Sequence, residues 1–138
     1  MADGPVIAEG LGGRRALVTA GAAGIGKAVA QALAAAGAKV HICDIDEAAL
    51  SRTLAGTPGL SGSLADIADD NAVDQLFATL AGELGGLDIL VNCAGIAGPT
   101  AAIEDIAPED WRRTVAVNLD SAYLCTRRAV PLLKAAGG

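Results

Sequence analysis

The sequence predicts an α/β fold in which helices cover both faces of a doubly wound parallel sheet, in three αβα layers. Three observations predict it. Short apolar segments typical of buried strands alternate with segments of helical periodicity. A glycine-rich turn separates the first such strand from the first helix, and an aspartate ends the second strand. Because strand–helix–strand crossovers are right-handed, this alternation gives a sheet of parallel strands.

The first half of the chain predicts two strands and two helices. Residues 15–20 are apolar on both faces, as in a central parallel strand. Residues 25–36 repeat apolar side chains at helical spacing and stop before a glycine. Residues 39–44 form the second strand, and residues 47–54 form a short helix. His41 lies within the second strand, and we assign it to packing or to the surface.

The second half continues the alternation. Residues 60–64 are a weak third strand, followed by a helix that Asp69 or Asp70 caps and that ends after Leu84. Residues 88–92 form a fourth strand whose continuous apolar run suits a buried centre. About four strands are therefore expected, an incomplete form of the doubly wound sheet in which the third, second, first and fourth strands lie side by side in that order.

The last predicted element is a helix over residues 108–136. Pro108 suits a first helical turn, and Glu109 and Asp110 follow it on the favourable side of the helix dipole. Pro131 is expected to kink the helix near its end. Five side chains are expected to face inward: Trp111, Val115, Leu119, Ala122 and Val130.

Length and charge limit the class of protein. The chain has 138 residues, which suffices for one domain, and a net charge of −6. Its arginines occur in isolated pairs, so we expect no nucleic-acid partner, which would require a clustered basic face. No apolar run reaches the length of a membrane span. Residues 1–13 lack the pattern of a secretory signal and are interpreted as a flexible lead-in to a domain over residues 14–138.

Cysteine and histidine usage argues against a metal site. Cys43, Cys93 and Cys125 are far apart in the sequence, and the chain has one histidine. We therefore expect no metal, and reduced, buried thiols in a cytoplasmic protein.

The stretch from Thr19 to Gly26 is the strongest functional signal. Its glycines allow a sharp turn and a close approach of the backbone to a ligand. The helix that follows presents unpaired N–H groups and the positive end of its dipole to an anion. Asp44 follows Gly26 by 18 residues, near the spacing at which a carboxylate meets the ribose of a dinucleotide. The alternatives are a tight turn without a ligand and an aspartate that only forms a turn. The combined order favours a Rossmann-type dinucleotide site.

Four stretches together resemble the classical short-chain dehydrogenases/reductases. Residues 19–26 are similar to that family's Thr-Gly-x-x-x-Gly-x-Gly, and Asp66-Ile67 stand where the family contacts adenine. Asn92-Cys93-Ala94-Gly95 resembles its Asn-Asn-Ala-Gly, and Val117-Asn118-Leu119 places an asparagine where the family has one on a helix. The order and spacing agree over nearly the whole chain from Arg14 onward.

The sequence departs from the family pattern at three places. Ala20 replaces the first glycine, and Gly21 beside it is expected to supply the freedom that the turn needs. Cys93 replaces the second asparagine, which puts one contact that braces the loop in doubt. The family's Ser and Tyr-x-x-x-Lys are not found in this chain. Tyr123 with Arg127 mimics that pair, but arginine does not exchange protons as lysine does, so we assign Tyr123 to packing.

The resemblance implies hydride transfer between NAD and a small alcohol or ketone substrate, with this chain carrying the cofactor-binding half and being inactive alone. It also implies a homo-oligomer. The alternative is a Rossmann module that binds a nucleotide or a protein without catalysis. Asn118 would support catalysis through a proton relay. The implied cofactor-binding residues are Gly21, Ala23, Gly24, Ile25, Gly26, Asp44, Ile45, Asp66, Ile67, Asn92, Ala94 and Gly95.

Overall fold

The structure, a computed structural model, describes residues 10–137. Most of the predicted lead-in, residues 1–9, lies outside the described residues. Residues 10–13 form a turn, in which Arg14 N donates to Leu11 O at 3.0 Å. Gly13 N donates to Gly37 O at 3.0 Å, so this turn is attached to the loop after the first helix.

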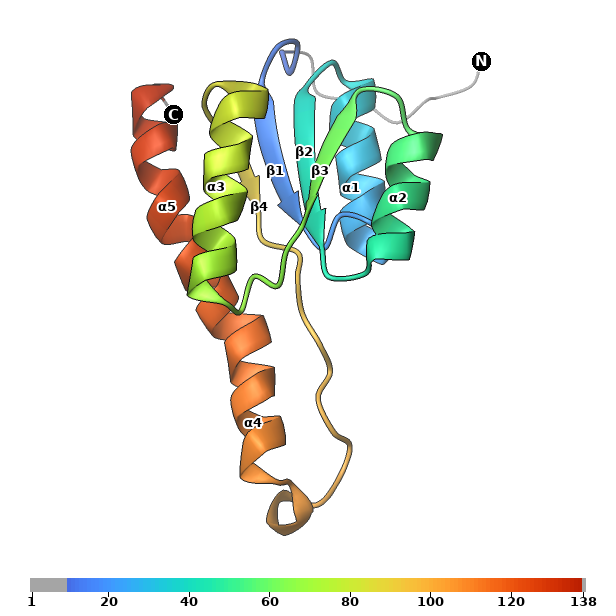
Figure 1. Cartoon of the computed structure of the whole chain (residues 1–138), viewed down its shortest axis with the longest axis vertical. Helices are drawn as coiled ribbons and strands as arrows, with labels where there is room; N and C mark the ends of the chain where they lie inside the picture. Colours follow the sequence, from blue (N-terminus) through green and yellow to red (C-terminus); the bar gives the residue numbers. More distant parts are fainter. Residues whose placement is uncertain (1–9, 138) are drawn as a thin grey trace.

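Four parallel strands form one sheet with the order β3-β2-β1-β4, as the sequence predicts (Figure 1). Helices cover both of its faces, so the three-layer αβα fold is confirmed. The strands are β1 (Arg15–Thr19), β2 (Lys39–Asp44), β3 (Leu60–Leu64) and β4 (Ile89–Val91). The helices are α1 (Gly24–Ala35), α2 (Glu47–Gly56), α3 (Asp70–Leu84), α4 (Pro108–Val115) and α5 (Ser121–Ala135).

The core has two layers because successive side chains of a strand point to opposite faces. On one face, Ala16 and Val18 of β1 pack with α1 and α2. On the other face, Leu17 packs with α3 and α5. From Ala16 to Thr19 both faces of β1 are fully buried, which explains the apolar run from Ala16 to Val18.

Aspartates start two of the helices. The Asp46 carboxylate accepts from Ala49 N at the start of α2. The Asp69 carboxylate accepts from Asn71 N and Ala72 N, so Asp69 rather than Asp70 caps α3. Gly85 ends α3 with a φ of 71°, a conformation that favours glycine.

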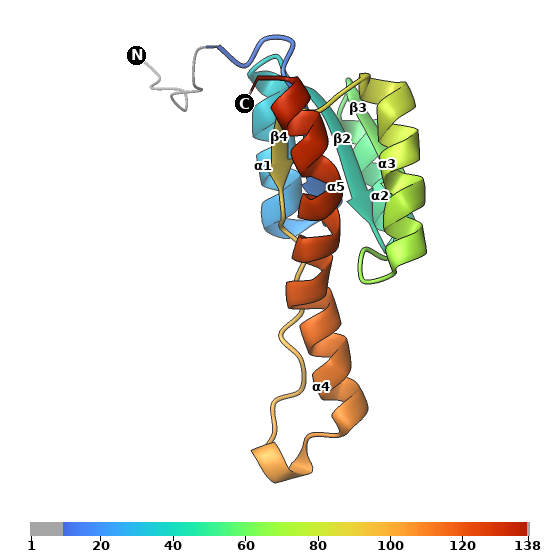
Figure 2. The same cartoon turned by 90° about the vertical axis from the view of Figure 1, so that its left-hand side faces the viewer.

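The C-terminal helical region differs from the single helix predicted. A short 3₁₀ turn, η1 (Ile103–Asp105), precedes α4, and a π turn, η2 (Ala116–Asp120), joins α4 to α5. None of the eight residues of α4 is buried. In both views α4 and the loop before it extend beyond the sheet (Figure 2). Pro131 lies within α5, and a kink there stays a prediction.

The predicted inward face of this region was wrong. Trp111, Leu119 and Val130 are exposed, and Val115 and Ala122 are only half-buried. Small side chains face the core instead, at a spacing of four residues: Val117, Ser121, Cys125 and Ala129. Small residues at these positions allow α5 to lie close to the sheet and α3. Leu124, Leu132 and Leu133 pack beside them, partly buried, whereas Leu119, Tyr123 and Val130 are exposed.

Candidate cofactor-binding site

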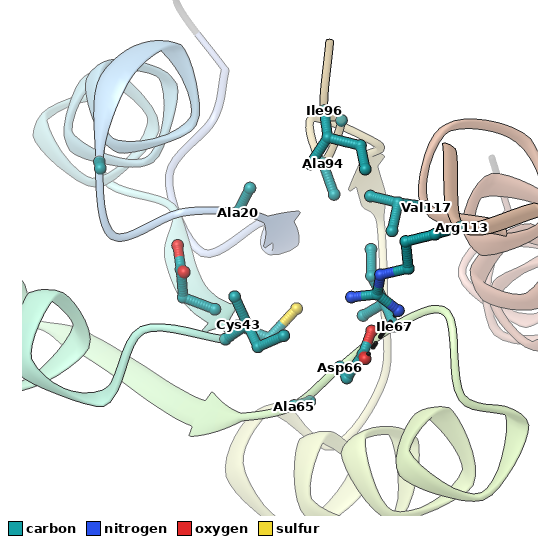
Figure 3. Close-up of a pocket in the computed structure, with 13 residues that line it drawn as sticks. Ala20, Cys43, Ala65, Asp66, Ile67, Ala94, Ile96, Arg113 and Val117 are labelled. Carbon is teal, nitrogen blue, oxygen red and sulfur yellow. Dashed lines mark hydrogen bonds and ion pairs between the residues drawn. The ribbon is translucent and has the colours of Figure 1, made fainter. Parts of the chain in front are cut away.

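A cavity of about 290 Å³ opens where the strands end at their carboxyl side (Figure 3). Segments after β1, β3 and β4, the end of β2, and the α4–η2 region contribute to its lining. Ligands of open α/β sheets bind at this edge. Seven of the predicted cofactor residues line the cavity: Ala23, Asp44, Ile45, Asp66, Ile67, Ala94 and Gly95. Six further lining residues were not predicted: Ala20, Cys43, Ala65, Ile96, Arg113 and Val117.

Close packing fixes the glycine-rich turn beside the cavity. A Cβ on Gly21 would lie 2.6 Å from Cβ of Ile42, and one on Gly26 would overlap the Ala20 carbonyl. Gly24 has a φ of 54° and open space around it. Ala20 itself has a φ of 50°, whereas Gly21 is outside the left-handed region. The expectation that Gly21 supplies the conformational freedom was therefore wrong, because Ala20 adopts the strained conformation itself.

The N-terminus of α1 is suited to an anion. No side chain caps it, and its first turn carries no acidic residue. By contrast, α2 and α3 have the aspartate caps described above. The first N–H groups of α1, including those of Gly24, Ile25 and Gly26, have no intrahelical acceptor. A bound phosphate would complete this helix end.

Asp44 ends β2 and lies between the turn and the cavity. One carboxylate oxygen accepts from Ala22 N at 3.0 Å, and the other accepts from Asp46 N at 3.1 Å. Each oxygen keeps a second lone pair for a further donor. The carboxylate can therefore accept from ligand hydroxyls while it stays attached to the backbone.

Asp66 and Arg113 form an ion pair at the cavity. Asp66 Oδ1 accepts from Ala68 N at 3.0 Å, and Oδ2 accepts from Arg113 Nη1 at 3.1 Å (Figure 3). Ile67 beside them is buried. Arg113 comes from α4, 47 residues along the chain. Sequence reasoning missed it because no local pattern shows which face of α4 approaches the loop after β3.

Backbone groups brace the loop after β4. Cys93 N and Ala94 N donate to Thr19 Oγ1 at 2.9 and 3.1 Å, and Thr19 is fully buried. The replacement of asparagine by Cys93 therefore leaves the loop attached to β1. The Asn92 side chain donates to Thr126 Oγ1 on α5 at 3.1 Å and does not line the cavity.

Asn118 joins the same loop to α4 and η2, which we call the helical arm. Its Oδ1 accepts from Ile96 N at 3.1 Å, and its Nδ2 donates to Ile96 O and Thr114 O at 2.8 and 2.9 Å. Asn118 lies in the π turn η2, and such turns are frequent at functional sites. A Cβ on Gly95 would lie 2.8 Å from Asn118 Oδ1, so glycine permits this approach.

Other candidate reactive groups lie apart from the cavity or are inert. Tyr123 is 62% exposed and lies with Arg127 in a shallow groove of α5, so it is not packed as predicted. Burial raises the pKa of Cys43 to about 12 and that of Cys125 to about 11, so both stay as thiols at neutral pH. Both are free and buried as expected, whereas Cys93 is half-buried. Within residues 10–137, no group of three or more metal-ligating side chains is assembled.

No helix of the described chain has the length and apolarity needed to cross a bilayer.

Comparison with known proteins agrees with the geometry. The family described as enoyl-(acyl carrier protein) reductase matches residues 20–138. A short chain dehydrogenase/reductase of Gibberella zeae is 41% identical over 123 residues, covering 87% of this chain and 46% of the relative. A tropinone reductase homologue of Arabidopsis thaliana is 43% identical over 134 residues, covering 92% of this chain and 50% of the relative.

A solved structure shares the fold. The 3-ketoacyl-(acyl-carrier-protein) reductase from Brucella melitensis, complexed with NADH, has a TM-score of 0.88 and 36% identity. The alignment covers 92% of this chain and 53% of that protein. The chain thus spans about half the length of the curated relatives it matches. On the family match, the relatives and the shared fold, the chain belongs to the short-chain dehydrogenase/reductase family.

Proposed function

We propose that this chain is the cofactor-binding half of an NAD-dependent oxidoreductase acting on an alcohol or ketone. The observation that carries the proposal is the joint placement of Asp44 and the uncapped N-terminus of α1 beside one cavity. When bound, a nicotinamide cofactor supplies or accepts a hydride. The Brucella relative holds NADH, which supports this cofactor class.

The proposed residue roles are those that the resemblance to short-chain dehydrogenases/reductases implies. Gly21, Gly24, Ile25 and Gly26 form the pyrophosphate side, with Ala23 between them. Asp44 accepts from the adenosine ribose, beside Ile45. Asp66 and Ile67 bind adenine. Asn92, Ala94 and Gly95 serve the nicotinamide-side ribose. Asn118 supports a proton relay through water and, through its bonds to Ile96, holds the loop that carries Ala94 and Gly95.

Charge favours NAD over NADP. A 2′-phosphate would lie near the Asp44 carboxylate, which repels it. Ala22, Ala23 and Ile45 offer no cation to offset that repulsion. Arg113 is the cationic side chain among the cavity residues, and it is paired with Asp66. A charged hydrogen bond contributes about 1.5–3 kcal/mol, so we expect roughly tenfold to hundredfold discrimination.

Titration of NAD and NADP into the purified chain tests the proposal. We expect tighter binding of NAD, and Asp44→Ala should relax the preference. Ala81→Gly, an exposed change on α3, is the control and should leave the ratio of the two dissociation constants unchanged. Equal or tighter binding of NADP by the unsubstituted chain would contradict the assignment of Asp44. A homo-oligomer and a cytoplasmic location stay predictions.

A further inference from the structure

Thr53 on α2 contacts the glycine-rich turn from outside the cavity. Its side chain is 1% exposed, and its Oγ1 donates to Ala22 O at 2.9 Å. The two residues are 31 positions apart, so the tertiary fold makes this contact. Thr53 is not among the cavity residues, and no local motif of the sequence marks it.

Ala22 is also held through its backbone N–H group. Ala22 N donates to Asp44 Oδ2 at 3.0 Å, and Gly21 N donates to Cys43 O at 3.1 Å. Ala22 is 4% exposed. The Asp44 carboxylate therefore accepts from the N–H of Ala22, and the Thr53 hydroxyl donates to its C=O. We call these three residues the Ala22 clamp.

The clamp sets the direction in which the next peptide groups point. Ala22 O belongs to the peptide that joins Ala22 to Ala23, and Ala23 is the N-cap of α1. Fixing that carbonyl fixes the plane of the peptide and the entry into the helix. The free N–H groups of Gly24 and Ile25 follow directly. Hydrogen bonds to an anion depend on such pre-set directions, since a turn that must reorder loses part of the binding free energy.

We propose that Thr53 is a positioning residue for the phosphate-binding turn, acting through the Ala22 carbonyl. The inference rests on the proposed dinucleotide site and adds to it a residue that touches no ligand. It predicts a selective effect. Ligands that carry the pyrophosphate depend on the turn, whereas adenosine alone depends on the Asp44 and Asp66 side of the cavity.

The test compares ADP-ribose and adenosine by calorimetric titration, well below the unfolding midpoint of each variant. Thr53→Val keeps the shape of the side chain and removes the hydroxyl. Thr53→Ser keeps the hydroxyl and serves as the rescue variant. Thr79→Val makes the same change at an exposed position on α3.

We expect Thr53→Val to weaken ADP-ribose binding about two- to tenfold, the range for one hydrogen bond, and to change adenosine binding less than twofold. Thr53→Ser and Thr79→Val should bind both ligands like the unsubstituted chain. An equal loss for both ligands, or no loss for either, would overturn the role of Thr53 while leaving the proposed function standing. Failure of the unsubstituted chain to bind ADP-ribose would overturn both.

Discussion

Ala20 shows how the contacts around a turn impose a backbone conformation on one residue. A left-handed backbone conformation places Cβ close to the following carbonyl, and non-glycine residues rarely adopt it. Ala20 nevertheless has a φ of 50°, because Gly21 is held by Cys43 O and Gly26 packs directly on the Ala20 carbonyl. The surrounding contacts therefore impose a conformation that alanine alone disfavours.

Ala20→Gly should raise the free energy of unfolding by about 1 kcal/mol, because strain relief exceeds the entropy that glycine adds to the unfolded chain. Urea denaturation measures the change. Ala81→Gly, at an exposed helical position on α3, is the matched control and should lower the free energy of unfolding by about 1 kcal/mol. A loss of stability in Ala20→Gly equal to that control would show that the turn does not strain Ala20.

His41 is a second residue whose surroundings change one of its properties, here its pKa. It is fully buried in β2, with its ring nitrogens 2.7 Å from Ser61 Oγ and 2.8 Å from Ser63 Oγ on β3. Of the two places expected for His41, packing and not the surface is the one observed, and both polar ring atoms have partners. Burial lowers the pKa of His41, and the Glu83 carboxylate partly opposes this shift.

The lowered pKa of His41 predicts acid sensitivity. Between the unfolded pKa of about 6.5 and the lower folded pKa, the unfolded chain binds the proton more readily. The histidine contribution to stability is thus present above about pH 6.5 and is lost as the pH falls below it. Urea unfolding at pH 7.5 and pH 5.5 should show a smaller pH dependence in His41→Gln than in the unsubstituted chain. An identical dependence would mean that His41 keeps its ordinary pKa.

At the scale of elements, two features leave apolar surface open. In the described chain β4 pairs with β1 alone, although its sequence suits a buried strand, and its three residues are only half-buried. The outward face of η2 and α5 carries large side chains, a set that we call the outer stripe: Leu119, Tyr123 and Val130. Trp111 of α4 is also 58% exposed. Unpaired strand edges and large apolar patches recruit other chains.

The chain is therefore expected to self-associate through the β4 edge or the helical face of α4 and the outer stripe. Light scattering over a wide concentration range should show a mass above that of the monomer. Leu119→Glu should reduce association if the outer stripe is the contact, whereas Ala81→Glu on α3 is the control and should not. A folded monomer at all concentrations, with slow amide exchange at residues 89–91, would contradict this prediction.

At the scale of the molecule, the cavity is assembled from segments spread over about a hundred residues. Ala20 and Val117 both line it, as do residues from the segments between them. Helix α4, which buries none of its own residues, reaches it through Arg113. The arm and the sheet are linked further by the Asn118 bonds to Ile96. The lining of the cavity and the placement of the arm are thus physically connected.

The set of side chains that line the cavity also predicts that the 138-residue chain does not catalyse turnover of a substrate. Its one tyrosine, Tyr123, lies in the α5 groove and not among the cavity residues, and Arg127 does not exchange protons as a lysine does. A steady-state assay with NAD and a panel of secondary alcohols should give no rate above background. Turnover that disappears in Tyr123→Phe would show that the Tyr123–Arg127 pair is catalytic.

The sequence patterns predict the strand order, the two covered faces and seven of the thirteen residues that line the cavity. These features depend on local patterns: apolar runs, helical spacing, glycine turns and aspartates at strand ends. Such patterns can be recognised in the sequence because each is confined to one turn or one element. An aspartate cap on α3 and the buried thiols of Cys43 and Cys125 follow from the local sequence in the same way.

Long-range packing determines which face of α5 is buried and that Ala20 has the left-handed conformation. It also brings Thr53 to the glycine-rich turn and Arg113 to the cavity. In α5 the inward positions belong to small residues because the helix lies close to the sheet, a preference that hydrophobicity alone does not express. The contacts of Thr53 and Arg113 join positions 31 and 47 residues apart. These contacts depend on how the helices pack on the sheet, which cannot be predicted from the spacing of residues within one element.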